Sequence, residues 1–193
     1  MTAASAGFGL RPVVHPTGLD RAHRYLNAIP STYGSNIYKY QPVALNSSGE
    51  IVVLASLTNQ DWIGVFAGLM YIDAFGKPNF VNNWIAGTTL GTGELWAFIW
   101  DDPGIEYEVQ ADGPVPQTAL GDQANFLASM GTGSNLTGLS NGQIDATVVT
   151  AGSQGMVRIV DIQTRPDNAW NDDFTIVLVQ NARHQYVANK VAI

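Results

Sequence analysis

The stretch Leu95–Gln110, LWAFIWDDPGIEYEVQ, constrains the fold of this chain more than any other segment. Residues 105–110 alternate apolar and polar side chains, the period of a β-strand with one buried face and one solvated face. Residues 95–100 are almost continuously apolar, as expected for a strand that is covered on both faces. The sequence DDPG between them forms turns readily, because proline fixes φ and glycine accepts positive φ. We therefore expect a β-hairpin here, within a large antiparallel structure.

Similar strand signals recur along most of the chain. Apolar, β-branched and aromatic residues are concentrated at 37–45, 50–55 and 62–72, and again at 144–150, 156–164 and 175–181. Clusters of turn-forming residues separate these runs at roughly regular spacing, and the chain contains 20 Gly and 9 Pro. This pattern predicts a mainly β protein: an antiparallel β-sandwich or barrel, jelly-roll-like, with an extended N-terminal arm and little helix.

Residues 1–40 differ in kind from the rest of the chain. Glycine and proline interrupt every regular period, and Phe8, Leu10 and Val13 stand singly among polar residues. A solvated tail has no need of such apolar anchors, so we expect an extended N-terminal arm rather than a disordered terminus. Asp20 could begin a short helix over residues 20–28. Residues 41–193 are then expected to form a single antiparallel β domain.

The charge of the chain is unevenly distributed. The net charge is −7, yet residues 1–40 carry a net +3, residues 41–173 a net −12 and the last twenty residues a net +2. An acidic body repels phosphate, so we expect no nucleic-acid partner. The longest apolar run, 62–72, is far shorter than the roughly 20 residues of a membrane helix, and the N-terminus does not resemble a signal peptide, so we expect no membrane partner.

Carboxylates are the best catalytic candidates in the sequence. Glu106 and Glu108 share one face of a predicted strand at about 7 Å, which overlaps the spacing used by inverting glycosidases. Such an acid and base must flank the substrate bond, however, and strand alternation alone predicts both glutamates on a solvated face. His15, His23 and His184 lack the spacing of metal ligands, and no serine-nucleophile or phosphate-binding motif is present. We therefore predict neither enzymatic activity nor a cofactor.

Two further patterns allow a ligand. Oxygen-bearing side chains gather at Asp167–Asp173, where calcium is one interpretation and a turn whose side chains bond their own backbone is the other. Tryptophans could form a sugar-stacking platform, although core packing is the commoner fate of tryptophan within apolar strands. The five tryptophans are Trp62, Trp84, Trp96, Trp100 and Trp170.

Four segments together resemble head decoration, or capsid cement, proteins of tailed bacteriophages. They are GFGLRPVVHPTG (7–18), DDPGIEYEVQ (101–110), GSNLTGLS (133–140) and RIVDIQTRPDNAW (158–170). The residue before the histidine is often basic in such proteins, whereas here it is Val14. The resemblance implies a virion protein, assembled in the host cytoplasm, that binds the outer surface of the assembled capsid and stabilises it. Its implied partners are the major capsid protein and further copies of itself, as a dimer or trimer at a local symmetry axis.

The basic arm is the expected contact with the shell, because an extended segment can add hydrogen bonds to an exposed sheet edge and many copies give avidity. The predicted capsid-binding residues are Phe8, Leu10, Arg11, Val13, His15, Arg21 and Arg24. The predicted oligomer interface consists of exposed aromatic residues, Tyr33, Tyr38 and Tyr40. A carbohydrate-binding or host-adhesion β-sandwich module is the alternative hypothesis.

Overall fold

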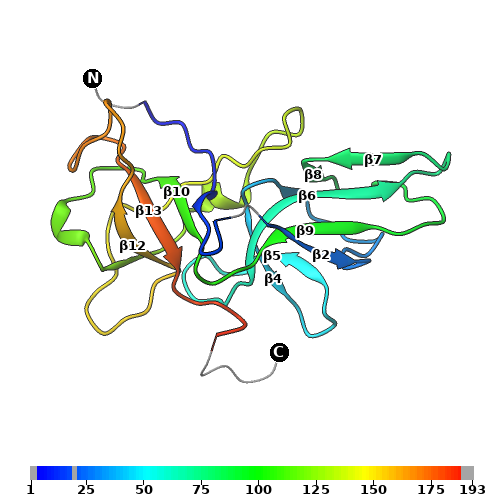
Figure 1. Cartoon of the computed structure of the whole chain (residues 1–193), viewed down its shortest axis with the longest axis horizontal. Helices are drawn as coiled ribbons and strands as arrows, with labels where there is room; N and C mark the ends of the chain where they lie inside the picture. The colour runs from blue at the N-terminus through cyan, green and yellow to red at the C-terminus, as the bar shows by residue number, and fades with distance from the viewer. Residues whose placement is uncertain (1–3, 19–20, 188–193) are drawn as a thin grey trace.

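The computed structural model describes residues 4–18 and 21–187 and is mainly β, with 38% of residues in strands and 4% in short 3-10 helices (Figure 1). No described helix has the length and apolar character needed to cross a membrane. The strands are β1 (Arg11–Val14), β2 (His23–Leu26), β3 (Ile37–Tyr38), β4 (Pro42–Leu45), β5 (Ile51–Val53), β6 (Gly64–Ile72), β7 (Pro78–Val81), β8 (Asn83–Trp84), β9 (Trp96–Trp100), β10 (Glu106–Gln110), β11 (Gln123–Ala124), β12 (Val157–Ile162) and β13 (Ile176–Asn181). The 3-10 helices are η1 (Gln117–Ala119) and η2 (Ala128–Gly131).

The strands form two main sheets. The five-stranded sheet has the order β1-β10-β13-β12-β11. The six-stranded sheet has the order β2-β9-β6-β4-β5, with β7 paired to β6, and β3 and β8 form a small separate pair. Every strand pair in the described chain is antiparallel. The two sheets occupy opposite ends of an elongated molecule (Figure 1), so the antiparallel β prediction is confirmed, and its jelly-roll form stays a prediction.

The predicted hairpin at Leu95–Gln110 is wrong, although both of its strands exist. Strand β9 pairs with β2 and β6 in the six-stranded sheet, whereas β10 pairs with β1 and β13 in the five-stranded sheet. The turn itself is present, since the Ile105 N–H donates to the Asp102 carbonyl at 3.2 Å and the Gly104 N–H donates to the Asp102 side chain at 2.8 Å. An alternating pattern shows which face of a strand is buried but not which strand lies beside it. Here the turn carries the chain from one sheet to the other.

Other strand predictions can be compared directly with the sheets. Strands β4 and β5 form the expected hairpin around a turn at 46–50, β12 pairs with β13, and β6 is a long central strand. No strand forms at 144–150. The backbone N–H groups of Ile144, Asp145 and Val149 donate to two separate segments, to Gln110 in one and to Asn125 and Gln123 in the other. The β-branched residues of this run therefore lie in an irregular connection.

The N-terminal segment is extended, but it is built into both sheets. Strand β1 forms one edge of the five-stranded sheet through β10, and β2 forms one edge of the six-stranded sheet through β9. The short helix predicted over 20–28 is wrong, because residues 23–26 are a strand, and Asp20 lies outside the described residues. Leu10, Ile29 and Ile37 are buried in the core. The described part of residues 1–40 therefore does not form an arm separate from the body.

Two hydrophobic cores are joined through β6 and β9. Val65 and Trp100, which are cross-strand partners, belong to the core beside the five-stranded sheet. Their chain neighbours Phe66 and Ile99, also cross-strand partners, point to the opposite face and belong to the second core. Successive side chains of a strand point to opposite faces, so one strand pair can enter both cores.

Replacement of Leu10 tests whether the N-terminal segment is part of the core. Leu10 is 0% exposed, so we expect Leu10→Ala to lower the free energy of unfolding by about 2–5 kcal/mol through lost burial and the cavity left behind. Val13 is 42% exposed, and Val13→Ala should cost less than about 1 kcal/mol. Urea denaturation followed by tryptophan fluorescence measures both. Similar small losses in the two variants would contradict the core position of Leu10.

Candidate functional site

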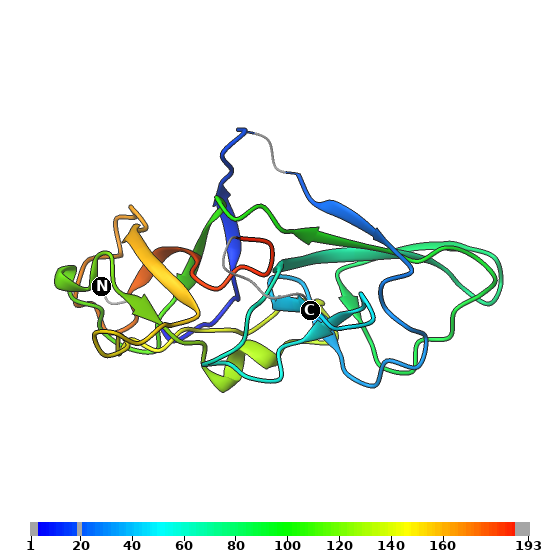
Figure 2. The same ribbon diagram turned by 90° about the horizontal axis from the view of Figure 1, so that it is seen from below.

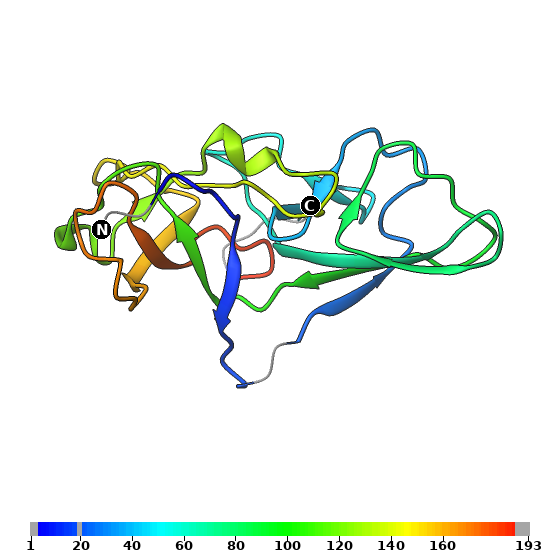
Figure 3. The same cartoon turned by 90° about the horizontal axis from the view of Figure 1, so that it is seen from above.

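A projecting segment, residues 13–18, is here called the hook. From the end of β1 the chain runs out from the body before it returns in β2 (Figures 2 and 3). Val13 and Val14 are 42% and 46% exposed, and Pro16, Thr17 and Gly18 are also exposed. A hollow of about 390 Å³ lies against the hook. The hook therefore presents apolar side chains on an edge strand, away from both cores.

The predicted capsid-binding residues separate into internal and surface groups. Leu10 belongs to the first core, so its assignment to a capsid contact is wrong. The Arg11 guanidinium lies 4.3 Å from the centre of the Phe8 ring, and its Nη1 lies 3.8 Å from Oε1 of Glu108. Phe8 and Arg11 therefore make their contacts with other residues of this chain. The members at or near the surface are Val13, His15, Arg21 and Arg24.

A buried carboxylate, Asp101, anchors the returning strand below the hook. Its side-chain oxygens lie 2.7 and 2.8 Å from Nδ1 of His23, and it accepts a hydrogen bond of 2.6 Å from the Tyr25 hydroxyl. The backbone carbonyl of Asp101 accepts a hydrogen bond of 2.8 Å from Nε2 of His184. Asp101 thus fastens β2 and the C-terminal segment to the turn between the sheets. A polar hollow of about 240 Å³ adjoins it, lined by His15, Thr17, Arg21, His23, Asp101 and Asp102.

The surroundings of Asp101 change the acidity of two tyrosines. Burial, and then the hydrogen bond to Asp101, raise the pKa of Tyr25 above its ordinary value. Burial is also the main cause that raises the pKa of Tyr107, with the negative charges of Asp101 and Asp102 adding to it. The Tyr107 hydroxyl donates to the Trp100 carbonyl at 3.0 Å. Both hydroxyls therefore remain protonated, and the hydrogen bonds that they donate stabilise the fold.

Glu108 does not lie on a solvated face, contrary to the alternation-based expectation. It is 5% exposed, while Glu106 is half-buried. Oε2 of Glu108 accepts hydrogen bonds from Nη2 of Arg165 at 2.5 Å and from Nε2 of Gln163 at 2.9 Å, and Arg11 approaches Oε1. Two cations and an amide compensate this buried carboxylate. Its role is to join β1, β10 and the turn after β12.

The outer face of the six-stranded sheet carries an apolar row that crosses four strands. Leu26 of β2 pairs with Trp96 of β9, which pairs with Met70 of β6, which pairs with Phe80 of β7. Cross-strand partners point to the same face, so these four side chains lie together. Leu26 and Phe80 are 48% and 74% exposed, and none of the four belongs to either core. We call this set the outer apolar row.

The surroundings of the outer apolar row suit contact with a protein surface. The Arg24 guanidinium lies 5.0 Å from the centre of the Trp96 ring, and Phe98 is the cross-strand partner of Arg24. Gly68, at φ 133°, leaves a shallow hollow of about 210 Å³ beside Phe80 and Phe98. Tryptophan, phenylalanine, methionine and arginine are enriched at protein interfaces, and here Phe80 and Arg24 are exposed while Trp96 and Met70 are half-buried. Only the strand register, which the sequence pattern does not reveal, brings these residues together.

The tyrosines predicted at an oligomer interface are engaged inside the molecule. Tyr38 is buried, and its hydroxyl donates to Oδ1 of Asn135 at 2.7 Å, so its assignment to an exposed interface is wrong. Tyr33 accepts a hydrogen bond from the Val53 N–H at 2.8 Å and packs against the second core. The half-buried Tyr40 stacks on Trp100, with 5.9 Å between ring centres and an interplanar angle of 6°. None of the three is a free aromatic side chain on the surface.

Buried tryptophans and the turn at 167–173, which suggested a sugar or a calcium ligand, have structural roles in the fold. Trp62, Trp84 and Trp100 are buried, so a sugar platform built from all five tryptophans is wrong. In the turn at 167–173, Asn168 bonds the backbone of Gln163 and Ile176, and Asp172 accepts from the Ala169 N–H at 2.8 Å. Within residues 4–18 and 21–187, no group of three or more histidine, cysteine or acidic residues is placed to hold a metal ion. These side chains therefore have an explanation as turn-stabilising groups.

Replacement of Glu108 tests its structural role. We expect Glu108→Gln to lower the free energy of unfolding by about 1.5–3 kcal/mol, because charge-assisted hydrogen bonds to Arg165 are weakened in a buried site. Glu106→Gln, two residues away on a more exposed position, should change it by less than about 0.5 kcal/mol. Chemical denaturation at neutral pH compares the two. A larger loss for Glu106→Gln would refute this assignment.

The raised pKa of Tyr107 predicts that the folded state becomes less stable at alkaline pH. Above its ordinary pKa of 10.0 the unfolded chain releases the Tyr107 proton and the folded chain keeps it, so stability falls as pH rises. The contribution of this residue is about 1.4 kcal/mol per pH unit. Tyr107→Phe should remove that part of the slope, although it also removes the hydrogen bond to Trp100. Denaturation curves at several pH values above 10 measure how the free energy of unfolding changes with pH, and the same measurement near neutral pH is the internal control. An unchanged alkaline slope in Tyr107→Phe would contradict this prediction.

Comparison of the chain with protein-family models, with curated proteins and with solved structures gives no match in any of the three. The functional argument therefore depends on the residues and surfaces described above.

Proposed function

We propose that this chain is a structural protein that binds the outer surface of an assembled bacteriophage capsid and stabilises it, as a decoration or cement protein without catalytic activity. Its proposed location is the virion, and its proposed partners are the major capsid protein and other copies of itself. The proposal begins from the resemblance of residues 7–18, 101–110, 133–140 and 158–170 to such proteins. Three of these segments contain β1, β10 and most of β12, which belong to one sheet.

The observation that carries the proposal is the outer apolar row. Exposed apolar patches on a folded domain mark protein interaction sites, and a flat sheet face can cover a broad, slightly curved surface such as a shell. Phe80 and Trp96 supply large contact areas, and Arg24 above Trp96 can pair with an acidic group on the partner. A row across four strands is also rigid, which lowers the entropy lost on docking.

The hook extends this surface along β2. Arg24 and Leu26 lie in β2, and His15 and Thr17 of the hook line one hollow together with Arg21 and His23 at the start of that strand. Val13 and Val14 on the hook can add a second contact to a neighbouring subunit. Two weak contacts on one rigid body increase the overall affinity, and many copies on a symmetric shell increase it further.

In this proposal the distribution of charge determines which side of the protein faces the capsid. Arg24 lies over Trp96 on the proposed contact side, whereas the chain as a whole carries a net charge of −7. A basic contact side suits an acidic shell surface, and the acidic remainder directed outward would keep decorated particles from associating. Self-association at a local symmetry axis is the natural arrangement on such a shell.

Charge introduced into the outer apolar row should prevent capsid binding. We expect a Leu26→Asp, Phe80→Asp double variant to bind undecorated heads at least about tenfold more weakly, because two carboxylates would be desolvated at the contact. Sedimentation of the purified protein with heads that lack it measures bound fraction against concentration. The melting temperature of the decorated particles gives the stabilisation in the same samples.

The control introduces the same two charges at exposed leucines elsewhere. Leu120 and Leu136 are 51% and 95% exposed and lie outside the outer apolar row, so a Leu120→Asp, Leu136→Asp double variant should bind as the unchanged chain does. Equal binding by both double variants would refute the role of the row. Failure of the unchanged chain to bind any head would refute the proposed function itself.

A further inference from the structure

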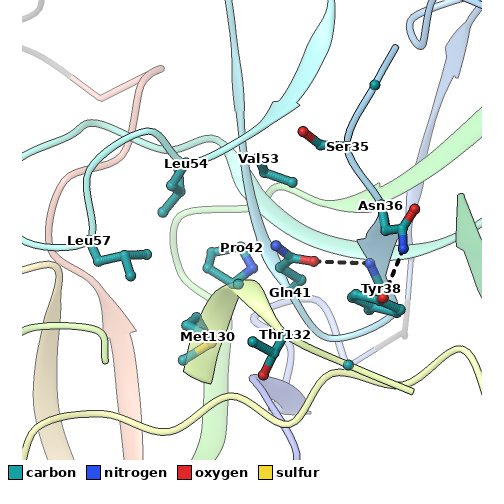
Figure 4. A pocket seen from close by; sticks show the side chains of 13 residues that line it. Ser35, Asn36, Tyr38, Gln41, Pro42, Val53, Leu54, Leu57, Met130 and Thr132 are labelled. Atoms are coloured by element: carbon teal, nitrogen blue, oxygen red, sulfur yellow. Dashed lines mark hydrogen bonds between the residues drawn. The ribbon is translucent and has the colours of Figure 1, made fainter. Parts of the chain in front are cut away.

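A further hollow in the described chain lies away from both the hook and the outer apolar row. It has a volume of about 510 Å³, which is within the range of small-molecule sites (Figure 4). Residues before β4, residues after β5 and the end of η2 form its walls. Its lining consists of Gly34, Ser35, Asn36, Tyr38, Gln41, Pro42, Val53, Leu54, Leu57, Met130, Gly131, Thr132 and Gly133. Three segments distant in sequence therefore converge on one site.

Gln41 at the base of this hollow carries a free hydrogen-bond donor. The side chain is 2% exposed, and its Oε1 accepts a hydrogen bond of 3.0 Å from the Tyr38 backbone N–H. That bond fixes the amide so that Nε2 points into the space between Pro42 and Leu54 (Figure 4). Nε2 has no hydrogen-bond partner among the described residues, and it is not one of their buried unpartnered polar atoms, so it is open to solvent in the hollow. A molecule that supplies an acceptor can therefore bond this oriented donor in place of water.

The polar wall beside Gln41 is already ordered. Asn36 donates to the Tyr38 hydroxyl at 3.0 Å and accepts from the Ala86 N–H at 2.8 Å, and the Tyr38 hydroxyl donates to Asn135. The amide and phenol groups therefore hold fixed positions before any ligand arrives. Exposed hydroxyls at the mouth, on Ser35 and Thr132, can bond further polar groups.

The remaining lining restricts the class of ligand. None of the residues that line the hollow carries a charge, so an ionic ligand would lose hydration without gaining a counter-charge. Pro42, Leu54, Leu57 and Met130 form an apolar wall opposite the amide. The site therefore matches a neutral molecule that combines a carbonyl acceptor, a small apolar group and several hydroxyls.

We infer that this hollow binds an N-acetylated neutral sugar unit. The acetamido carbonyl would accept the hydrogen bond from Nε2 of Gln41, its methyl group would pack against Leu54 and Leu57, and the ring hydroxyls would lie toward Ser35 and Thr132. The volume of about 510 Å³ accommodates one such unit with room for a linked neighbour at the open side. This binding site is independent of the proposed contact with a capsid, since it uses none of the same residues.

Titration with free N-acetylglucosamine tests the inference directly. Chemical-shift changes in the amide spectrum of the ¹⁵N-labelled full chain should saturate with a dissociation constant on the order of 1 mM and should include the Gln41 side-chain amide. Glucose lacks the acetamido group and should bind at least about tenfold more weakly. Absence of saturable shifts with N-acetylglucosamine, or equal binding of the two sugars, would overturn the inference.

Two variants separate loss of the site from loss of the fold. Gln41→Glu keeps an acceptor for the Tyr38 N–H but replaces the donor, and it should weaken N-acetylglucosamine binding at least about tenfold. Leu57→Trp fills the hollow from a half-buried position and should also abolish binding, while Leu120→Trp on the exposed surface should leave it unchanged. Each variant must retain the spectrum of a folded chain. Undiminished binding by folded Leu57→Trp would refute this location.

Discussion

The pairing of β6 with β9 holds the two hydrophobic cores in one molecule. Because side chains alternate between faces, Val65 and Trp100 pack with the five-stranded sheet while Phe66 and Ile99 pack in the second core. Farther along β9, the face that carries Trp100 continues to Trp96, where no core residue covers it. One sheet face is thus a core at one end and a candidate docking surface at the other. The proposed docking surface would gain its rigidity from the packing that stabilises the fold.

The sequence pattern predicted the strands of this fold better than it predicted which strands pair with each other. The antiparallel β architecture, the β4–β5 hairpin and the central strand β6 could all be read from apolar periods and turn residues. The partners of β9 and β10 could not, because the same DDPG turn can close a hairpin or carry the chain to another sheet. Residues 23–26 contain few strong β-formers, and pairing with β9, a tertiary interaction, decides their conformation.

The candidate site was predictable only in outline. Composition pointed to the N-terminal segment, and Val13, Arg21 and Arg24 do lie at the surface. Single apolar residues in an irregular segment, however, can be surface anchors or core residues, and Leu10 belongs to the core. The outer apolar row depends on strand register, which no local pattern contains. The Gln41 site depends on an amide orientation fixed by one backbone hydrogen bond, so it too was invisible in the sequence.

The placement of β1 has a consequence for how the chain folds. Its partner β10 lies in the middle of the sequence, and β10 in turn pairs with β13 near the C-terminus. Strand β1 therefore completes its sheet only after segments that are distant in sequence have come together. Such non-local closure is slow, and it leaves the apolar residues of β1 exposed until its partner strands have paired. The net charge of −7 would then help to keep incompletely folded chains apart.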